Sequence, residues 1–404
     1  MLPSLPRPSQ RNLAVRVTAD ALRQIRGGHP WIFDGSITST SHDGAPGDLA
    51  VVFDDRRNFA AIGLWDPASP IRVRILSTRQ EPIGGDFWAA GLAAADRRRP
   101  RLLGDVATTG LRRIHGENDQ MPGLVADQYG DTLVLKLYSA VWFAHLTALI
   151  EQLQSVWNPE RIVVRLARNL SDQTPPGLHD GQILTGSALT GPVTFQENGL
   201  RMQADPVAGQ KTGYFLDQRA NRSLVQAMAL DARVLDVFCC HGGFSVHAAA
   251  GGARSVHATD LSPHATAAAA EHLRVNTPNT PFDTTTGDAF EVMDQLAHQR
   301  EQFDLVVVDP PSFAPRAAAV PGALRAYSRL TELAVKLVVP GGVLVQASCS
   351  SRVSADAFRT TVLDSATRSG HQLTIINETG HDEDHPVGFP EGAYLKAVFA
   401  TVTR

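Results

Sequence analysis

The sequence predicts an α/β protein whose C-terminal domain is a doubly wound parallel sheet, preceded by a β-rich N-terminal domain and a central α+β domain. Two observations support this. From about residue 206, apolar strands of four to six residues alternate with helical stretches, which is typical of a parallel sheet covered by helices. Residues 13–80 hold short β-like runs separated by Gly, Pro, Asp and Ser, which indicates a small, mostly antiparallel domain.

The same patterns place three domains at residues 1–82, 83–200 and 201–404. One short helix is expected at 19–28 in the first domain, and a helix at 85–104 links it to the second. The second domain alternates strand-like segments with one helix over 140–157. In the third, strands are expected at 234–238, 255–260, 303–309 and 341–348, with one more ending near residue 288, between the second and third of these ranges.

Composition excludes several classes of protein. The net charge of −4 argues against a protein that coats nucleic acid by bulk electrostatics, although a local basic stripe is compatible with it. Three cysteines in 404 residues cannot form a disulfide framework, which favours a reducing compartment. The N-terminus lacks the apolar core of a signal peptide, and no stretch is long and apolar enough for a membrane span. We therefore expect a cytoplasmic protein with no membrane partner.

Acidic residues follow the predicted strands of the C-terminal half. Asp236 lies in the first strand, ahead of a turn that contains Gly242 and Gly243, and Asp260 ends the second strand. Further acids stand where the third and fourth strands end, at Asp288 and Asp309. Such sheets bind ligands at the carboxyl ends of their strands, and an acid after the second strand commonly holds the ribose hydroxyls of a nucleotide. Four acids in this order predict a cofactor site.

The fourth strand ends abruptly in Asp309-Pro310-Pro311-Ser312-Phe313. Proline cannot donate a ladder hydrogen bond, so the two prolines stop the strand and stiffen the loop. A fixed carboxylate beside an aromatic ring suits a flat, polar substrate such as a nucleobase. The loop is therefore predicted to hold a base.

These motifs resemble, in their order, those of class I S-adenosylmethionine-dependent methyltransferases. Longer strings are similar to the large-subunit ribosomal RNA cytosine-C5 methyltransferases, which carry an N-terminal PUA domain; they are KTGYFLDQRANR, DVFCCHGGFS, DPPSF, ASCSS, DHPVGFPEGAYLKAVFA and, near the N-terminus, RVTADALRQIRGGHPWIFDGSI. The resemblance implies a Rossmann-like methyltransferase domain, S-adenosylmethionine as the cofactor and large-subunit ribosomal RNA as the partner. A homodimer is one expectation by analogy.

The resemblance also assigns residues around the cofactor. Gln218 and Arg219 belong to a segment that closes over the cofactor in the similar family. Phe238 and Cys240 stand where the two leading glycines of the first motif commonly fall, which is a departure from the general pattern. The family's own variant, Asp-x-Phe followed by Gly-Gly-Phe, matches better, so we expect Asp236, Phe238, Gly242, Gly243, Asp260, Asp288 and Asp309 to line the cofactor site.

A cysteine is needed to methylate C5 of cytosine, because C5 becomes nucleophilic only after a thiolate adds to C6. Cys349 follows a predicted strand and should face the same edge as Asp309 and Pro310, whereas free cysteines are more often buried. We predict Cys349 as the nucleophile. Cys239 and Cys240 lie in the cofactor turn, and no second ligand pair at zinc spacing accompanies them, so no metal is expected.

The densest basic cluster is Arg97, Arg98 and Arg99, with Arg101, Arg112 and Arg113 nearby in sequence. Together with Pro311 and Phe313, the first three are candidate contacts to RNA, although a solvated helix face explains them almost as well.

Two other functions fit parts of the pattern. Asp-Pro-Pro followed by an aromatic residue is also typical of enzymes that methylate an amino nitrogen of a purine, and that reaction needs no cysteine. A ribosome-assembly factor that binds RNA without catalysis would need no intact cofactor residues. Cys349 distinguishes the first alternative from C5 methylation, and cofactor binding distinguishes the second.

Overall fold

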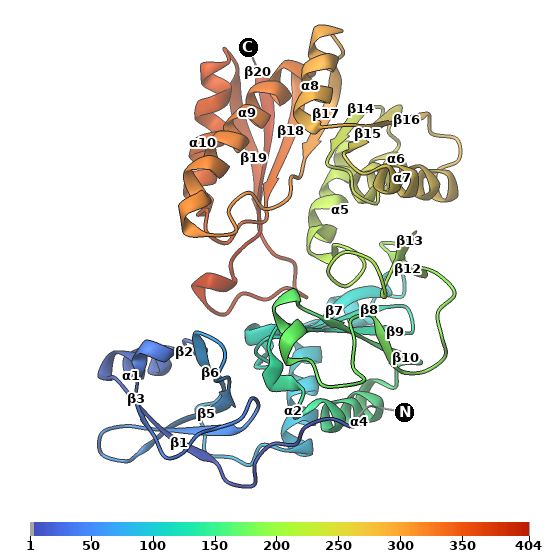
Figure 1. The fold of residues 1–404 in the computed structure, drawn as a ribbon. Helices are drawn as coiled ribbons and strands as arrows, with labels where there is room; N and C mark the ends of the chain where they lie inside the picture. Colours follow the sequence, from blue (N-terminus) through green and yellow to red (C-terminus); the bar gives the residue numbers. More distant parts are fainter. Residues whose placement is uncertain (1–3, 404) are drawn as a thin grey trace. The chain divides into compact units, whose positions relative to one another are not determined.

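The computed structural model describes residues 4–403, which form two compact units (Figure 1). The first unit contains the chain up to Gln196, together with Gln203–Leu216 and Glu383–Phe389. The second contains Glu197–Met202, Asp217–Asp382 and the C-terminal part from Pro390. The chain thus passes between the units several times. Within residues 4–403, no helix is long and apolar enough to cross a membrane.

The N-terminal part of the first unit is a six-stranded sheet in the order β2-β6-β5-β4-β1-β3. Only β1 and β4 pair in parallel, while the other pairs are antiparallel, as the sequence predicts. Its elements are β1 (Leu13–Val17), α1 (Ala19–Arg26), β2 (Trp31–Phe33), β3 (Ile37–Thr40), β4 (Leu49–Phe53), β5 (Phe59–Trp65) and β6 (Ile71–Ser77). The helix begins where the Thr18 hydroxyl accepts the backbone N–H of Ala21 at 3.3 Å.

The central part is a five-stranded sheet in the order β11-β10-β9-β8-β7. Its elements are α2 (Gly85–Arg97), α3 (Pro100–Gly104), β7 (Gly110–His115), β8 (Leu124–Tyr129), β9 (Thr132–Leu137), α4 (Leu146–Trp157), β10 (Arg161–Leu166) and β11 (Gln182–Thr185). The single helix expected at 85–104 is divided, because Pro100 has no amide hydrogen to continue α2 and instead starts α3. Helix α4 begins later than expected, after a short 3-10 turn at Ala140–Trp142.

The two sheets of the first unit share one hydrophobic core. Leu64 and Leu76 of the N-terminal sheet are buried together with Trp88, Trp142 and Leu149 of the central helices. Polar contacts join the same parts, since the Ser139 hydroxyl donates to Asp66 at 2.6 Å. The β-rich part is therefore not an independent appendage, although the domain boundaries at 82 and 200 stay a prediction.

The second unit contains a seven-stranded sheet in the order β16-β15-β14-β17-β18-β20-β19. The first five strands are parallel, while β20 runs antiparallel to both of its neighbours. The strands are β14 (Arg233–Val237), β15 (Ser255–Asp260), β16 (Phe282–Thr286), β17 (Phe303–Val308), β18 (Val338–Ser348), β19 (Gln372–Thr379) and β20 (Lys396–Thr403). A separate hairpin, β12 (Val193–Glu197) with β13 (Leu200–Ala204), precedes them.

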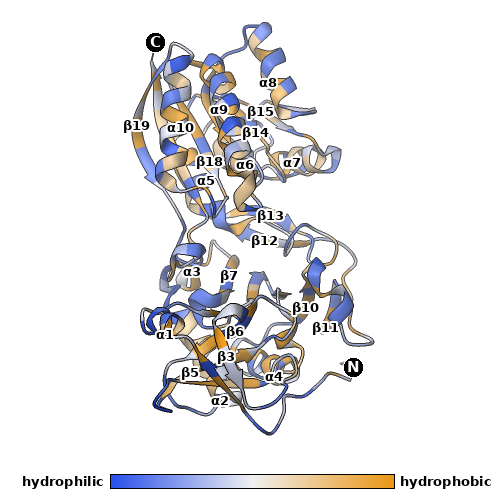
Figure 2. Cartoon of the chain, turned by 60° about the vertical axis from the view of Figure 1, so that its left-hand side comes forward, coloured by the Kyte–Doolittle hydropathy of each residue, from blue (hydrophilic) through white to orange (hydrophobic). Residues whose placement is uncertain are grey.

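Two groups of helices cover this sheet. Helices α5 (Arg219–Met228), α6 (Gly243–Ala250) and α7 (Pro263–Asn276) pack as one group, and α8 (Ala289–His298), α9 (Val320–Leu337) and α10 (Ala355–Arg368) pack as another. Figure 2 shows α8, α9 and α10 in alternating hydrophobic and hydrophilic bands, as expected for helices with one buried face. The doubly wound sheet predicted from the sequence is confirmed.

A buried arginine organises the central part of the first unit. Arg99 is fully buried, and its guanidinium donates to the Asp119 carboxylate at 2.5 Å and to the carbonyl oxygen of Ala95 at 2.7 Å. The same guanidinium donates at 3.2 Å to the carbonyl of Asp384, in the late segment Glu383–Phe389. Asp384 is itself buried, and its carboxylate accepts the backbone N–H of Arg112 at 3.0 Å. This network fixes the late segment within the first unit.

Replacing Arg99 by Met should destabilise the protein by about 3–5 kcal/mol, because Asp119 would keep a buried charge without its principal partner. Arg97→Met is the matched control, since Arg97 is the last residue of α2, two positions before Arg99, and is exposed; we expect it to change stability by no more than about 0.5 kcal/mol. The midpoint of urea unfolding measures both. Equal midpoints for the two variants would contradict the structural role of Arg99.

Candidate active site

The strand order brings the predicted site residues to one edge of the sheet. Asp236 lies one residue before the end of β14, Asp260 is the last residue of β15, and Asp288 follows β16. Asp309 follows β17 directly, and Cys349 follows β18 directly. Because these five strands are parallel, all of these residues stand at carboxyl ends, on both sides of the β14/β17 switch point where ligands bind in such sheets.

Asp236 is a buried carboxylate with one unused oxygen. Its Oδ2 accepts hydrogen bonds from the backbone N–H of Ser245 at 3.0 Å and from the Ser245 hydroxyl at 2.6 Å. Its Oδ1 has no hydrogen-bond partner among the described residues. Burial raises the pKa of Asp236 to about 6, against the effect of the Ser245 hydrogen bonds and with help from the nearby Asp260 charge. This oxygen can accept a hydrogen bond from a ligand.

The turn after β14 has an unusual backbone. Phe238 and Cys240 adopt positive φ angles of 65° and 49°, which are uncommon for residues with side chains. Gly242 has φ +74°, and a Cβ on it would lie 2.7 Å from the Cβ of Ala269 on α7. The glycine therefore allows α6 and α7 to pack closely, a different reason from the cofactor approach that the sequence suggests. Gly243 begins α6. Local strain of this kind is often found at functional sites.

Asp260 and Asp288 both accept hydrogen bonds from backbone N–H groups and can accept further ones from a ligand. Asp260 accepts the N–H of Cys240 at 3.0 Å through one oxygen and that of Ser262 at 2.9 Å through the other. Asp288 caps α8 by accepting the N–H of Phe290 at 2.9 Å. Since each carboxylate oxygen can accept two hydrogen bonds, both side chains can take further donors.

Asp309 is held by a short relay of amides. Gln218 Nε2 donates to Asp309 Oδ1 at 2.8 Å, and Asn221 Nδ2 donates to Gln218 Oε1 at 2.5 Å. Burial raises the pKa of Asp309 to about 7, with the negative charges of Asp217 and Asp236 adding to the shift and the Gln218 hydrogen bond opposing it. Asp309 therefore exchanges a proton near neutrality, as groups that handle protons at active sites commonly do.

Gln218 and Arg219 are buried, whereas a segment that closes over a cofactor from outside would be exposed. Gln218 is buried at the start of α5, and Arg219 is 1% exposed with its Nε 3.7 Å from Asp382. The structure thus assigns Gln218 a contact with Asp309, and the cofactor contacts expected of both residues stay a prediction.

Cys349 lies on a turn that contacts the Asp-Pro-Pro loop. Its Sγ is 4.0 Å from the carbonyl oxygen of Pro310. The next residue bridges the same loop, because the Ser350 hydroxyl donates to the carbonyl of Ala314 at 3.5 Å and accepts from the Ser312 hydroxyl at 3.3 Å. The structure therefore brings the predicted nucleophile and the predicted base-binding loop together.

Lys396 supports the Cys349 turn and was missed in the sequence. It opens β20, pairs in register with Ser348 and is 8% exposed. Its ammonium donates to the carbonyl oxygens of Ser350 and, at 2.6 Å, of Val353, which flank the far side of the turn. Burial lowers the pKa of Lys396 to about 8, while Cys349 acts to raise it. The feature of the sequence that could have identified Lys396 is a lysine at the start of a mostly apolar strand.

The other two cysteines are poor nucleophiles in this fold. Cys239 is 5% exposed and packs against Ala258 and Ala269, and burial raises its pKa far above the ordinary value. Burial also raises the pKa of Cys240 to about 11, with Asp260 contributing. Neither thiol forms a thiolate readily at neutral pH.

The expected RNA contacts differ in exposure. Pro311 is exposed, whereas Phe313 is half-buried with its ring 5.3 Å from that of Tyr327. Arg97 is exposed, and the Arg98 side chain is 42% exposed. Arg99 cannot reach a phosphate, because its guanidinium is buried and occupied by Asp119; the prediction for this residue was wrong. Consecutive arginines in the sequence gave no sign that only the third faces inward.

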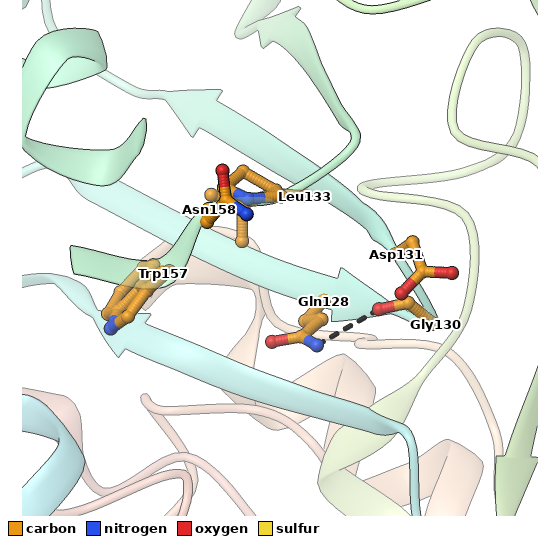
Figure 3. Close-up of a pocket in the computed structure, with 7 residues that line it drawn as sticks. Gln128, Gly130, Asp131, Leu133, Trp157 and Asn158 are labelled. Carbon is orange, nitrogen blue, oxygen red and sulfur yellow. Dashed lines mark hydrogen bonds between the residues drawn. The ribbon is translucent and has the colours of Figure 1, made fainter. Parts of the chain in front are cut away.

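Two features elsewhere among the described residues bear on other kinds of site. Among residues 4–403, no cluster of three His, Cys, Asp or Glu side chains could hold a metal ion. A pocket in the central part of the first unit is lined by Gln128, Gly130, Asp131, Leu133, Trp157, Asn158 and Pro159 (Figure 3). There the Gln128 amide donates to the Gly130 carbonyl at 2.9 Å. The sheet-edge residues described above belong to the second unit and are not part of this pocket.

Comparison with known sequence families gives two matches. The family described as S-adenosylmethionine-dependent methyltransferase matches residues 118–399, which is more than half of the chain. The PUA-like domain family matches residues 15–78.

Two relatives match almost the whole chain. A protein of Deinococcus radiodurans named ribosomal RNA large subunit methyltransferase is 42% identical over 403 residues, covering 98% of this chain and 99% of its own. A protein of Tolumonas auensis named ribosomal RNA large subunit methyltransferase I is 33% identical over 384 residues, covering 92% of this chain and 94% of its own.

Solved structures share the fold. A structure described as a SAM-dependent methyltransferase from Streptococcus mutans aligns with a TM-score of 0.82 at 17% identity, over 96% of this chain and 99% of that one. A second methyltransferase structure, complexed with S-adenosylhomocysteine, aligns with a TM-score of 0.83 at 18% identity, with the same coverage. The chain belongs to the family of S-adenosylmethionine-dependent methyltransferases and carries a PUA-like domain at its N-terminal end.

Proposed function

We propose that the protein methylates C5 of a cytosine in large-subunit ribosomal RNA, with Cys349 as the nucleophile. The observation that carries this proposal is the contact of the Cys349 turn with the loop that begins at Asp309. The substrate rests on the relatives, because the protein that is 42% identical to this chain is named for methylation of large-subunit ribosomal RNA.

The chemistry of the sheet edge fits the cofactor. S-adenosylmethionine supplies a methyl group on a positively charged sulfur, and it carries hydrogen-bond donors on its ammonium, ribose and adenine groups. The edge offers matching acceptors in the unused Oδ1 of Asp236 and the remaining lone pairs of Asp260 and Asp288. We assign Asp260 to the ribose hydroxyls, Asp288 to the adenine end, and Asp236 with the Phe238–Gly243 turn to the amino-acid end.

The nucleophile acts on the base before the methyl group is transferred. The Cys349 thiolate forms a bond to C6, and the electron pair of the C5–C6 double bond moves to C5. C5 would then bond to the methyl group while the methyl–sulfur bond breaks; the electron pair of that bond stays on the sulfur, which leaves as the thioether of S-adenosylhomocysteine. Removal of the C5 proton by a base restores the double bond and releases the thiolate, so that Cys349 is regenerated. The chain must therefore keep Cys349 reactive and hold the ring beside it.

Lys396 and Asp309 suit these two tasks. The ammonium of Lys396 fixes the carbonyl groups after Cys349 and places a positive charge behind the turn, which favours a thiolate over a thiol. Asp309, with Pro310 directly after it, is held by Gln218 at the mouth of the strand. In this position, the carboxylate can accept a hydrogen bond from the amino group of cytosine. Its pKa of about 7 also allows it to carry a proton.

Methylation of a purine amino nitrogen is the alternative reaction. It would use the Asp309 carboxylate and the Pro310 carbonyl as acceptors for the amino group and would not need Cys349. A non-catalytic role in ribosome assembly is the third candidate. Covalent trapping distinguishes the first two, and cofactor binding distinguishes the third.

Cys349→Ser should abolish methyl transfer while cofactor and RNA still bind, because a hydroxyl barely ionises at neutral pH, unlike a thiol of pKa about 8.5. RNA containing 5-fluorocytidine provides the direct measurement, since fluorine blocks proton removal from C5. With S-adenosylmethionine present, the wild-type protein should form a covalent complex that survives denaturing electrophoresis, and Cys349→Ser should not.

Cys239→Ser and Cys240→Ser are the controls, and both should still be trapped. Trapping that persists in Cys349→Ser but disappears in either control would show that another cysteine is the nucleophile. Full methylation by Cys349→Ala would end the C5 mechanism and favour the amino-nitrogen reaction.

Asp309→Asn should lower methylation by about 10²–10⁴-fold, the usual scale for losing a positioned acid or base. The same change should stabilise the cofactor-free protein at alkaline pH. The pKa of Asp309 is raised from 3.8 to about 7 on folding, so its contribution to stability is full below about pH 4 and is lost as the pH rises through 7. The melting temperature of Asp309→Asn should therefore exceed that of the wild type at about pH 8 and match it near pH 4.

Asp364→Asn is the matched control for this experiment, because Asp364 is exposed on α10. It should leave the melting temperature unchanged at both pH values. An Asp309→Asn variant that is less stable than the wild type at alkaline pH would contradict the inference that the ionised Asp309 carboxylate destabilises the fold.

Asp260→Ala should weaken S-adenosylmethionine binding by roughly 1.5–3 kcal/mol, the cost of losing a charged hydrogen-bond partner. Calorimetric titration measures the dissociation constant, with Asp283→Ala as the control, because Asp283 is exposed on the neighbouring strand β16. An unchanged dissociation constant in Asp260→Ala would overturn the ribose assignment. Undetectable binding to the wild-type protein would instead favour the non-catalytic role.

A further inference from the structure

Four aromatic rings gather at the surface of the first unit. His29, Trp31 and Phe33 come from the start of the N-terminal sheet, and Phe389 comes from the late segment Glu383–Phe389. We call these four residues the aromatic cluster. Trp31 lies at the centre, with ring centroids 5.1 Å from Phe389, 5.7 Å from His29 and 6.3 Å from Phe33.

The aromatic cluster is only partly covered. Phe33 is 40% exposed, and the other three residues are half-buried. Interplanar angles between the rings range from 44° to 82°, so no ring in the cluster stacks face to face on another. Large apolar side chains gathered at a surface commonly mark an interaction site.

Polar contacts hold the rings in place. The Trp31 indole N–H donates to Glu117 at 2.9 Å, and Glu117 also pairs with Arg74 at 3.2 Å. Phe389 is placed by its segment, whose Asp384 is buried between Arg99 and Arg112, and whose Gly388 N–H donates to the Asn118 side chain at 2.6 Å. Two distant parts of the chain are therefore fixed around one partly exposed group of rings.

An exposed cation is linked to the aromatic cluster through Asn118. Arg98, with 42% of its side chain exposed, pairs with Asp119 at 3.1 Å and donates to the carbonyl oxygen of Asn118. Asn118 is the residue whose side chain binds Gly388, next to Phe389. Exposed aromatic rings together with a positive group are the combination by which proteins bind single-stranded nucleic acid, because bases stack on the rings and the cation attracts the phosphates.

We propose that the aromatic cluster stacks unpaired bases of the RNA substrate, with Arg98 contacting the adjoining phosphate. This inference rests on the proposed function only for the identity of the nucleic acid as RNA. Unpaired nucleotides are the target because bases inside an A-form helix are stacked on one another and are not available to aromatic side chains.

Point variants test this better than removal of the N-terminal domain, because Leu64 and Leu76 belong to the core shared with the central helices. The test variant is Phe33→Ala/Phe389→Ala in the full chain. Phe33→Tyr/Phe389→Tyr keeps the rings as the conservative counterpart, and Val156→Ala, at a 39% exposed position on α4, is the control for loss of surface apolar area.

The measurement is fluorescence anisotropy with a labelled, unstructured oligouridine and with a fully paired RNA duplex. For the unstructured RNA, the double alanine variant should bind about 10–100-fold more weakly, since stacking contributes roughly 1–3 kcal/mol per base. The tyrosine variant and Val156→Ala should stay within about threefold of the wild type. Duplex affinity and S-adenosylmethionine affinity should not change. Arg98→Ala should reduce the dependence of binding on salt, by a slope of about 0.7 for one phosphate on a single strand.

Unchanged affinity of the double alanine variant for the unstructured RNA would overturn the proposal, as would an equal loss on the duplex. Normal RNA binding with weakened binding to ribosomal subunits would mean that a protein occupies this surface, and would also overturn it. The assay involves no methyl transfer, so a protein that bound RNA through the aromatic cluster but methylated no cytosine would refute the proposed function and leave this inference standing.

Discussion

The alignment of parallel strands in the order β16-β15-β14-β17-β18 is the constraint on which the site depends. It brings the carboxyl ends of five strands to one edge, and therefore collects acids that are far apart in the sequence. These carboxylates repel one another, and the charges of Asp217 and Asp236 both raise the pKa of Asp309. A fold chosen only for stability would not place these carboxylates together at one edge.

Hydrogen bonds from neighbouring groups reduce the electrostatic destabilisation of these carboxylates but do not remove it. Gln218 donates to Asp309, and Ser245 donates twice to Asp236, yet both pKa values remain above the ordinary range. The turn at Phe238 and Cys240 adds backbone strain at the same edge. Repulsion between carboxylates and backbone strain thus occur at the same edge of the sheet. A positively charged cofactor bound there would reduce the repulsion.

The sequence predicted the strands, the acids at their ends and the position of Cys349 after a strand, because these follow from local patterns along the chain. It could not predict contacts between residues that are far apart in the sequence and meet only in the folded chain. The Gln218–Asp309 hydrogen bond joins residues 91 positions apart, and Lys396 reaches Ser350 from a strand 46 positions later. Arg99 was misjudged for the same reason, since its partner Asp119 lies 20 residues away and nothing local distinguishes it from the exposed Arg97.

The segment from Thr379 to Lys396 runs from the second unit through the first and back again. Its middle part, Glu383–Phe389, belongs to the first unit and ends in the ring that completes the aromatic cluster. Its ends belong to the second unit, where Thr379 donates to Asn221 of the Asp309 relay, Tyr394 donates to Asp217, and Lys396 holds the Cys349 turn. The aromatic ring of Phe389 and the groups that contact Asp217, Asn221 and the Cys349 turn therefore belong to one continuous stretch of chain.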